Sequence, residues 1–349
     1  MYFASDNAGP VAPEIMRALA RANEGAAMPY GDDAIMARVR TRIREIFEAP
    51  EAAVYLVATG TAANALSLAT VTQPWQAVFC HRHAHIEEDE CGAPEFFTGG
   101  AKLVLVDGDG ARIDPEQLRK IVAGTADTGV HGVQRGALSI TQLTELGTAY
   151  SLADIRALGK VAKSFDLPVH MDGARFANAL VTLGCTPAEM TWKSGIDILS
   201  FGATKNGAMG VEAVILFDPE KAWEFELRRK RGAHLFSKHR FLSAQMEAYL
   251  ADDLWLRLAR HANEKAARLE AGIRALDSGI ILQPRSANML FAGWPRAGHI
   301  RAQAAQAQYY LWPFSQSLDG PEDEILTARL VCNWATTDED IDRFLALLA

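Results

Sequence analysis

The chain has 349 residues, of which 49% are hydrophobic and 22% are charged, and this balance is typical of an ordinary soluble globular protein. Its formal net charge of −8 argues against nucleic acid as a main partner and fits an enzyme that acts on a small metabolite. No apolar run approaches the ~18 residues that a membrane-spanning helix needs, so we expect no membrane partner.

Two helices are predicted in the N-terminal segment. Pro13 suits the first position of a helix, and an apolar stripe follows it. Asp33 is the expected N-cap of a second helix, because apolar side chains then recur every four residues from Ile35 to Phe47. Pro50 ends this second helix.

From residue 53 onward, short apolar runs alternate with amphipathic helical stretches. Such runs are typical of strands that are buried on both faces, and their alternation with helices predicts an α/β fold with a mostly parallel sheet. The runs are Val54–Val57, Ala77–Cys80, Leu103–Val106, Ala137–Ile140, Pro168–Met171, Ile196–Phe201 and Ala213–Phe217. The helices among them include Glu116–Val122, Leu152–Phe165 and Ala177–Leu183. Ligands in such folds bind at the carboxyl ends of the strands.

The chain after residue 217 is predicted to be largely helical at first. A helix covers Ala222–Arg231 and leads into a basic loop at residues 228–232. A long helical region then runs from about Leu242 to Leu276. The apolar runs that follow it are short: Ile280–Leu282, Asn288–Phe291 and Arg329–Trp334.

The change of pattern within the long helical region suggests a domain boundary. We predict a large domain over residues 1–245 and a small C-terminal α+β domain over residues 246–349. Thr337 is expected to cap the last helix of the small domain, Asp338–Leu348.

The cysteines are scattered and form no CxxC pair: Cys80, Cys91, Cys185 and Cys332. Neither a zinc knuckle nor a disulfide framework is therefore expected, and a reducing, cytoplasmic setting is predicted. The first residues also lack the basic and apolar regions of a signal peptide.

One lysine stands at the end of a predicted buried strand. The stretch Ser200–Gly207 runs from this strand into a turn of small residues that carries Lys205. Lysine is rarely buried without a reason, and an amine with a lowered pKa can form a Schiff base with an aldehyde cofactor. The alternative is a lysine at an exposed loop tip, and these residues alone do not decide between the two.

An aspartate follows another predicted strand in His170–Arg175. A carboxylate at a strand end can pair with the protonated ring nitrogen of pyridoxal 5′-phosphate (PLP), and Arg175 is close enough to reach the ring oxygen or a substrate carboxylate. The bland alternative is a structural salt bridge between Asp172 and Arg175. Because Asp172 and Lys205 both stand at strand ends, the cofactor interpretation is favoured.

The segment Thr59-Gly60-Thr61-Ala62 follows the first strand and opens a helix. Backbone N–H groups at a helix N-terminus, with hydroxyls beside them, can bind phosphate. The segment matches neither a Walker A motif nor GxGxxG, which disfavours a dinucleotide. Taken alone, it is explained better as a capped helix start.

The alternating histidines His81, His83 and His85, followed by acidic residues at 87–90, resemble a metal site. Imidazoles at i, i+2 and i+4 on a strand share a face, which gives the alternative prediction of a metal-dependent hydrolase. We expect no metal, because no second ligand cluster stands out. The other interpretation places the flat ring of His85 against a planar cofactor.

Several stretches in chain order resemble the low-specificity L-threonine aldolases, which are PLP enzymes of the aminotransferase-like fold type I. The resemblance covers nearly the whole chain and is most specific in its Asp-Gly-Ala-Arg and Lys-Asn-Gly parts. It implies the PLP-dependent transferase-like fold type I, with a seven-stranded sheet in the large domain. The stretches are Ser5–Asn7, Tyr30–Asp33, Gly60–Asn64, Ala84–His85, Asp89–Ala93, Met171–Arg175 and Gly202–Gly207.

The resemblance implies roles for single residues. Lys205 would hold PLP as a Schiff base, Asp172 would pair with the ring nitrogen, and His85 would stack on the ring. These three and Arg175 are the expected catalytic residues. The other cofactor-binding residues implied are Gly60, Thr61, Ala62, Thr204 and Lys238, and the substrate-binding residues are Ser5, Tyr30, Asp32, Arg175 and Arg329.

The resemblance also implies a homotetramer, assembled as a dimer of dimers with active sites at the dimer interface. Tyr30 and the basic loop, with Lys238, are expected to reach the site of a neighbouring subunit. Many family members carry Glu-Asn-x-His before the aspartate strand, and here Thr144 stands at the position of that histidine. The base that takes the substrate hydroxyl proton is therefore open between His85, Glu90 and a PLP-bound water.

The activity implied is retro-aldol cleavage of L-threonine, L-allo-threonine and related β-hydroxy-α-amino acids such as phenylserine, which yields glycine and an aldehyde. The nearest alternatives are a β-eliminating lyase and an aminotransferase on the same fold. A degenerate member that only binds partners is disfavoured, because Lys205, Asp172 and Arg175 are all present.

Overall fold

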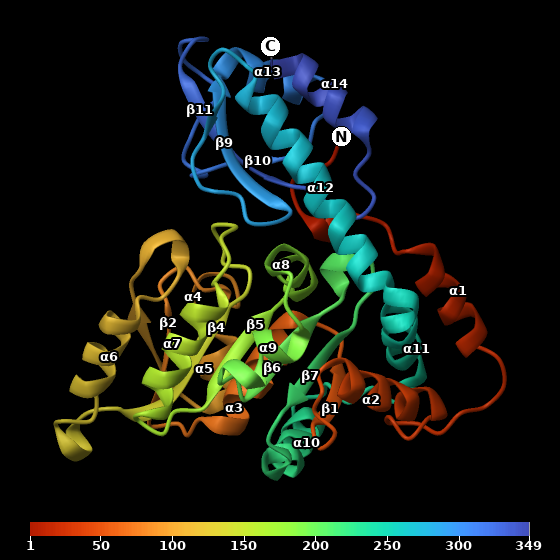
Figure 1. Cartoon of the computed structure of the whole chain (residues 1–349), viewed down its shortest axis with the longest axis vertical. Coiled ribbons are helices and arrows are strands. Elements are labelled where there is room, and N and C mark those ends of the chain that lie inside the picture. The colour runs from red at the N-terminus through yellow and green to blue at the C-terminus, as the bar shows by residue number, and fades with distance from the viewer. Residues whose placement is uncertain (349) are drawn as a thin grey trace.

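The computed structural model describes residues 1–348 and has two lobes joined by a long helix (Figure 1). The large lobe contains a seven-stranded sheet in the order β1-β7-β6-β5-β4-β2-β3. Strand β7 is antiparallel to both of its neighbours, and the other pairs are parallel. The predicted mostly parallel, seven-stranded sheet is therefore confirmed. Residue 349, the last of the predicted small domain, lies outside the described residues.

Each strand of the large sheet coincides with one of the predicted apolar runs. The strands are β1 Ala53–Val57, β2 Gln76–His81, β3 Lys102–Val106, β4 Gln134–Thr141, β5 Val169–Gly173, β6 Ile198–Gly202 and β7 Glu212–Leu216. The helices of this lobe are α1 Pro13–Ala22, α2 Ala34–Ile46, α3 Gly60–Val71, α4 His85–Glu88, α5 Ala93–Thr98, α6 Pro115–Gly124, α7 Leu152–Lys163, α8 Phe176–Leu183, α9 Pro187–Met190, α10 Ala222–Arg231 and α11 Arg240–Leu250.

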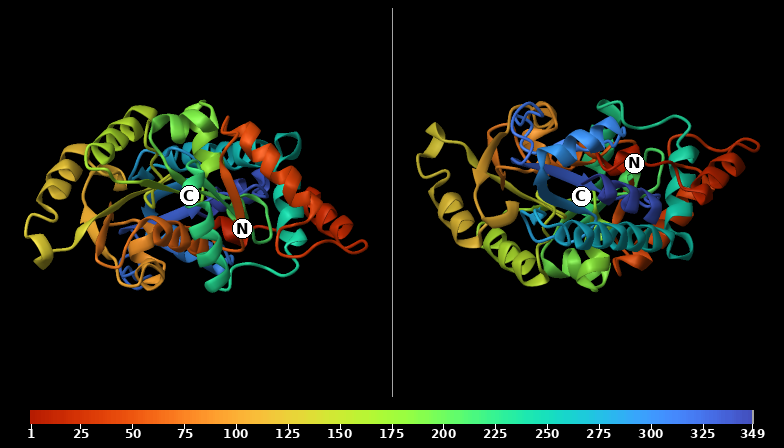
Figure 2. Two further views of the ribbon diagram at one scale, coloured as in Figure 1. Left: turned by 90° about the horizontal axis from the view of Figure 1, so that it is seen from below. Right: turned by 90° about the horizontal axis from the view of Figure 1, so that it is seen from above.

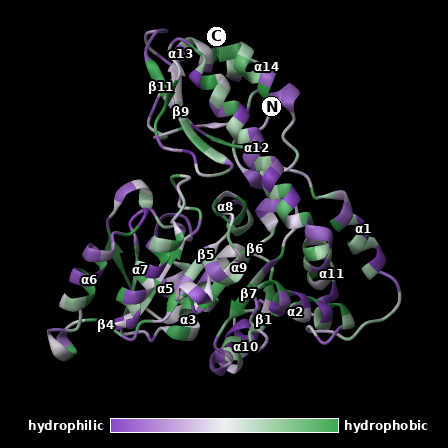
Figure 3. Ribbon diagram, viewed as in Figure 1, coloured by the Kyte–Doolittle hydropathy of each residue, from purple (hydrophilic) through white to green (hydrophobic). Residues whose placement is uncertain are grey.

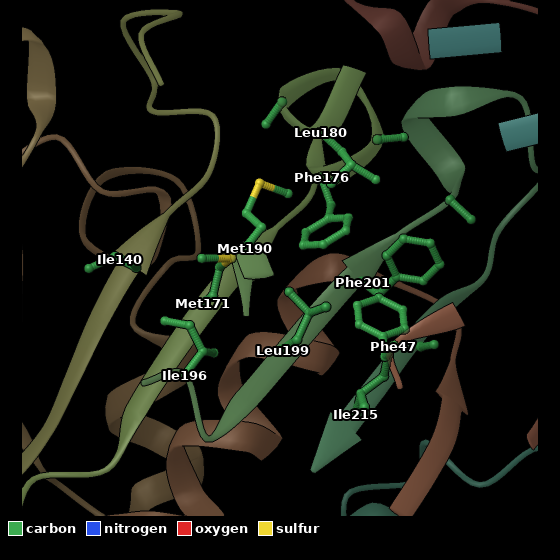
Figure 4. Packing of buried hydrophobic residues seen from close by; sticks show 14 of the residues in the cluster. Phe47, Ile140, Met171, Phe176, Leu180, Met190, Ile196, Leu199, Phe201 and Ile215 are labelled. Atoms are coloured by element: carbon green, nitrogen blue, oxygen red, sulfur yellow. The ribbon is translucent and has the colours of Figure 1, made fainter. Parts of the chain in front are cut away.

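Helices cover both faces of the sheet (Figure 2), and successive strand side chains point to opposite faces. Met171 and Phe201 belong to one face, where the ring of Phe201 lies 5.5 Å from that of Phe176 on α8 (Figure 4). Val214 and its neighbours on the other face pack against α3 and α10. Both faces are therefore apolar, as the predominantly green strands of Figure 3 show.

The predicted N-terminal helices are present. Pro13 is the first residue of α1, and the carboxylate of Asp33 caps α2 by accepting the Met36 N–H at 2.8 Å. The buried stripe of α2 is Met36, Val39 and Ile43, whereas the predicted Ile35 is only half-buried. A period of 3.6 residues turns Ile35 toward the edge of this stripe.

Two expectations for the middle of the chain are wrong. The basic residues 228–231 form the last turn of α10 and not a loop, and Arg229 is buried with its guanidinium 5.0 Å from the Tyr55 ring. The long helical region is broken between α11 and α12 (Leu254–Arg274). Asp252 and Asp253 adopt positive φ angles there, a conformation that aspartate tolerates better than most residues.

The small lobe is built on a four-stranded antiparallel sheet in the order β10-β11-β9-β8. Its elements are β8 Ile280–Ile281, β9 Met289–Pro295, α13 Arg296–Ala304, β10 Tyr310–Leu311, β11 Ile325–Val331 and α14 Asp338–Leu348. Thr337 caps α14 as predicted, accepting the Asp340 N–H at 3.1 Å. Among residues 1–348, none of the helices combines the length and the apolar character that crossing a membrane requires.

The two lobes have separate hydrophobic clusters that meet along α12. The cluster of the large lobe includes Ala259, and that of the small lobe includes Ala266. The division between residues 245 and 246 stays a prediction. Phe3 packs in the small-lobe cluster, 5.0 Å from the ring of Phe344, so the residues that follow it run along the junction of the lobes.

Candidate active site

A cavity of about 330 Å³ opens at the carboxyl edge of the large sheet. The larger hollows, of about 790, 780, 510 and 480 Å³, contain none of the predicted site residues. The predicted residues that line the smaller cavity are Gly60, Thr61, His85, Asp172, Thr204 and Lys205. They are joined there by Asn7, Ala58, Thr59, Asn64, Glu90, Ala174 and Glu212. We therefore take this cavity as the candidate site.

Asp172 and Lys205 meet because their strands are adjacent. Strands β5 and β6 are parallel neighbours, and Asp172 lies beside Ser200 in the register. Lys205 lies in the short turn after β6. Asp172 is only 3% exposed, and its carboxylate accepts the Ala174 N–H at 3.0 Å and the Asn64 amide at 2.9 Å. Both of these donors are uncharged.

A chain of polar contacts runs from Asp172 to His85. The amide of Asn64, on α3, also donates to Glu90 Oε1 at 2.8 Å. His85 Nδ1 lies 2.9 Å from the same oxygen. Within residues 1–348, one group of three or more histidine, cysteine, aspartate or glutamate side chains has its potential metal-ligand atoms within 4.8 Å of one another. This group is His85, Glu90 and Asp172.

These contacts set the charge of the pair formed by His85 and Glu90. Burial lowers the pKa of His85, but the hydrogen bond to Glu90 and the charges of Asp172 and Glu145 together outweigh burial. The pKa of His85 is therefore raised. Burial also raises the pKa of Glu90. A proton is thus held between His85 Nδ1 and Glu90 Oε1.

The start of α3 forms an open cradle in the cavity wall. Thr59 caps the helix by accepting the Ala62 N–H at 3.2 Å. A side chain built on Gly60 would meet no atom within 4 Å, so the backbone at this position faces empty space. The first N–H groups of a helix have no partner within it, and they attract anions. The cradle is suited to a phosphate group.

Arg175 does not pair with Asp172. Its guanidinium forms a bidentate ion pair with the Asp6 carboxylate, with hydrogen bonds of 2.7 and 3.1 Å, and both side chains are buried. Asn288 of the small lobe donates to the same carboxylate at 3.2 Å. Burial raises the pKa of Asp6, but the charges of Arg175 and Lys205, with the hydrogen bonds from Arg175 and Asn288, outweigh burial and hold the pKa below its usual value.

Asp6→Asn is expected to destabilise the fold by about 3–5 kcal/mol, because it leaves the Arg175 guanidinium buried without its counter-charge. Urea unfolding of the two proteins measures the difference. The pKa of Asp6 is lowered on folding, so its contribution is present at neutral pH and is lost as the pH falls through that lowered pKa. The gap between wild type and variant should therefore narrow in acid.

The exposed ion pair between Lys193 and Glu48, at 2.6 Å, is the control. Glu48→Gln should change the free energy of unfolding by less than about 1 kcal/mol. Equal losses in the Asp6 and Glu48 variants would contradict this account of Asp6.

The remaining predicted residues do not line the cavity: Ser5, Tyr30, Asp32, Ala62, Arg175, Lys238 and Arg329. Arg329, on β11, donates to the Ala4 carbonyl at 3.3 Å, and burial and the charge of Arg175 lower its pKa. Ser5 caps a short turn by accepting the Asn7 N–H. Tyr30, Asp32 and Lys238 are exposed.

The three alternating histidines do not form the shared face that a metal site would need. Strand β2 ends at His81, and His85 begins α4. Their ring nitrogens have different partners: the Gly108 carbonyl for His81, Glu88 for His83 and Glu90 for His85. The predicted shared face of His81, His83 and His85, on which the alternative of a metal-dependent hydrolase rested, is therefore wrong.

The sequence did not reveal all members of the site. Asp6 and Asn64 lie within the stretches that carried the resemblance, but only the structure gives their contacts. Glu212 had no sequence signal beyond being an acid at the start of an apolar run. Thr144 is buried and donates to the Gly110 carbonyl at 3.1 Å, so it serves the local loop structure.

Comparison with known proteins extends these observations. Residues 2–293 match the family model described as beta-eliminating lyase. The chain is 40% identical over 344 residues to the low specificity L-threonine aldolase of Pseudomonas aeruginosa, covering 98% of this chain and 94% of that one. It is 42% identical over 289 residues to the enzyme of the same name from a Pseudomonas species, covering 83% of each. The threonine aldolase structure from Leishmania major superposes with a TM-score of 0.90 at 27% identity, covering 99% of this chain and 98% of that one.

Proposed function

Because the chain belongs to the beta-eliminating lyase family, and within it to the low-specificity L-threonine aldolases, we propose that it cleaves L-threonine and L-allo-threonine to glycine and acetaldehyde. Membership makes the protein a lyase with the fold type I of PLP-dependent enzymes. Related β-hydroxy-α-amino acids such as phenylserine belong to the same proposal. The observation that carries it is the meeting of Lys205 and Asp172 in one cavity, beside the start of α3.

The residues of this cavity fit PLP. Lys205 offers an amine for its aldehyde, and Asp172 is a buried carboxylate whose present donors carry no charge, so a protonated ring nitrogen suits it. Gly60, Thr61 and Thr204 would hold the phosphate. When bound, PLP supplies an electron sink for the bond that breaks at the substrate Cα.

The proposed base is His85. Its Nδ1 is held by Glu90, which leaves Nε2 free to accept the proton of the substrate β-hydroxyl. Glu90 fixes the ring orientation and stabilises the imidazolium that forms. Of the candidate bases left open by the sequence, His85 alone combines a raised pKa with a fixed, partly exposed ring in the cavity.

The substrate carboxylate is assigned to Arg175 and Arg329. Asp6 engages two of the five donors of the Arg175 guanidinium, so others remain for a ligand. Arg329 adds a second cation from the small lobe, next to the junction. Holding the carboxylate would fix the orientation of the bonds at the substrate Cα, and this orientation would speed the cleavage.

Glu90→Gln is expected to shift the pH profile of kcat/KM toward lower pH. His85 must be unprotonated to act as a base, so the rate rises as the pH passes its pKa. Glu90 keeps that pKa raised, and its loss lowers the pKa and moves the rising limb with it. The activity on the plateau should also fall, because the imidazolium loses its counter-charge.

The chain offers a matched control in His83 and Glu88, which lie 2.8 Å apart on the same segment but are exposed. Glu88→Gln should leave the profile unchanged. An unshifted profile in Glu90→Gln would remove His85 from the role of base.

The activity is tested by incubating the protein with PLP and a panel of β-hydroxy amino acids. Release of an aldehyde with an equal amount of glycine supports the proposal. A keto acid with ammonia would instead identify a β-eliminating lyase, and an amino-group acceptor requirement would identify an aminotransferase.

We also propose that a second copy of the chain completes each site within a homotetramer. Tyr30 and Lys238 are exposed, and their segments are joined by a hydrogen bond from the Tyr30 N–H to the Ser237 carbonyl at 3.2 Å. Neither side chain lines the cavity of its own chain. Light scattering of the purified protein measures the assembly. A cytoplasmic location remains a prediction from the sequence.

A further inference from the structure

Glu212 reaches the candidate site because β7 runs against its neighbours. The first residue of an antiparallel strand lies where the neighbouring strands end. Glu212 therefore pairs with Val57 at the end of β1 and with Gly202 at the end of β6. The cradle at Gly60 and the turn that carries Lys205 follow these two strand ends, so Glu212 stands between them.

The side chain of Glu212 lies on the face of the sheet that α3 covers. Val214 and Leu216, which share its face by alternation, pack in one cluster with Ala62 and Ala63 in the first turns of α3. Glu212 is the one charged residue of β7, and it lies at the end of the strand that borders the cavity. It is only 7% exposed.

The carboxylate supports the lysine turn directly. Glu212 Oε2 accepts the Ala203 N–H at 2.7 Å, one residue before Thr204. The Thr204 hydroxyl in turn accepts the Val211 N–H at 3.1 Å, which ties the turn to the start of β7 a second time. Glu212 and Thr204 both line the cavity beside Lys205.

The charge of Glu212 is finely balanced. Burial raises its pKa to about 7, against hydrogen bonds from Thr204 and Ala203 and the positive charge of Lys205. Tyr249, which donates to the Gly202 carbonyl from α11, is a further ionisable group that the charge of Glu212 influences, and it is neutral. The positive charge of Lys205 opposes protonation of Glu212.

We propose that Glu212 is a positioning residue that holds the lysine turn and takes up one proton when a phosphate ester binds at the start of α3. The proposal rests on the function proposed above, in which PLP is that ester. One change on binding favours the neutral acid: a dianion arrives at the neighbouring cradle.

This coupling predicts how cofactor binding depends on pH. Below pH 7 the Glu212 carboxyl is already protonated, so PLP binding takes up few protons. Above it, each molecule bound must bring one proton to Glu212, so affinity falls by about tenfold per pH unit as the pH rises. The phosphate itself does not titrate in this range, because its second pKa is about 6.

Calorimetry of PLP binding to the full chain at pH 8, in buffers of different ionisation enthalpy, measures the protons taken up. Glu212→Gln should take up about one proton fewer than wild type and should bind PLP about 30-fold more tightly at pH 8.5, with similar affinity at pH 6.5. Asp197→Asn is the control. Desolvation also raises the pKa of its carboxylate, but this carboxylate accepts the Val169 N–H at 2.7 Å at the opposite edge of the sheet.

Equal proton uptake in wild type and Glu212→Gln would overturn the proposal. A second measurement needs no variant: the preference of wild type for PLP over pyridoxal, which lacks the phosphate, should fall as the pH rises from 7 to 9. A preference that stays constant would also overturn it. If wild type cleaves threonine and binds PLP, either result rejects only the role of Glu212, whereas wild type that binds no PLP rejects the proposed function as well.

Discussion

Lys205→Ala is expected to reduce kcat/KM for threonine cleavage on the order of 10⁴-fold, to near the limit of detection. Lys205 is the one lysine that lines the cavity, within the part of the chain that the structure describes. No neighbouring amine can therefore take over the covalent attachment of PLP. The turn itself should keep its shape, because Glu212 and Thr204 tie its backbone without using the lysine side chain.

Borohydride reduction followed by denaturation distinguishes loss of attachment from loss of folding. Reduced wild type should retain PLP after denaturation, and Lys205→Ala should release it, while both have the same circular dichroism. Lys193→Ala is the control, because Lys193 pairs with Glu48 on the surface and should keep full activity. Turnover within tenfold of wild type in Lys205→Ala would reject the assignment.

The sequence predicted the large sheet well because its strands are buried on both faces and appear as unbroken apolar runs. It did not predict β10, which is two residues long and is held by its pairing with β11. The break between α11 and α12 was also missed. Asp252 and Asp253 are compatible with helix ends as well as with helix surfaces, so their residue types do not reveal the turn that precedes α12, the helix that packs in both lobes.

The residues of the candidate site likewise divide into those that the sequence predicted and those that it did not. Asp172 and Lys205 were found because each follows a strand, and parallel neighbours bring such residues to one edge. Asp6 was given no role, because its contact with Arg175 depends on the N-terminal segment passing between the lobes. Glu212 was missed because an acid at the start of a strand is expected at the far edge of a parallel sheet. The reversal of β7 alone brings it to the cavity.

Asp172→Asn is expected to lower kcat on the order of 10³-fold while leaving PLP attached to Lys205. The variant keeps the size of the side chain and the bond from the Ala174 N–H. It loses the negative charge that would keep a proton on the ring nitrogen, and with it the capacity of the ring to accept electrons from Cα. The defect should therefore appear in turnover and not in cofactor retention.

Asn64 links Asp172 to Glu90. In wild type the Asn64 amide donates one hydrogen bond to the Asp172 carboxylate and one to the Glu90 carboxylate. Asp107→Asn is the control, because Asp107 follows β3 near the same sheet edge and pairs with the exposed Arg82. Borohydride should fix PLP to wild type, Asp172→Asn and Asp107→Asn alike, while only the Asp172 variant loses turnover. If that variant instead kept more than a tenth of the activity, the carboxylate would not control the ring nitrogen.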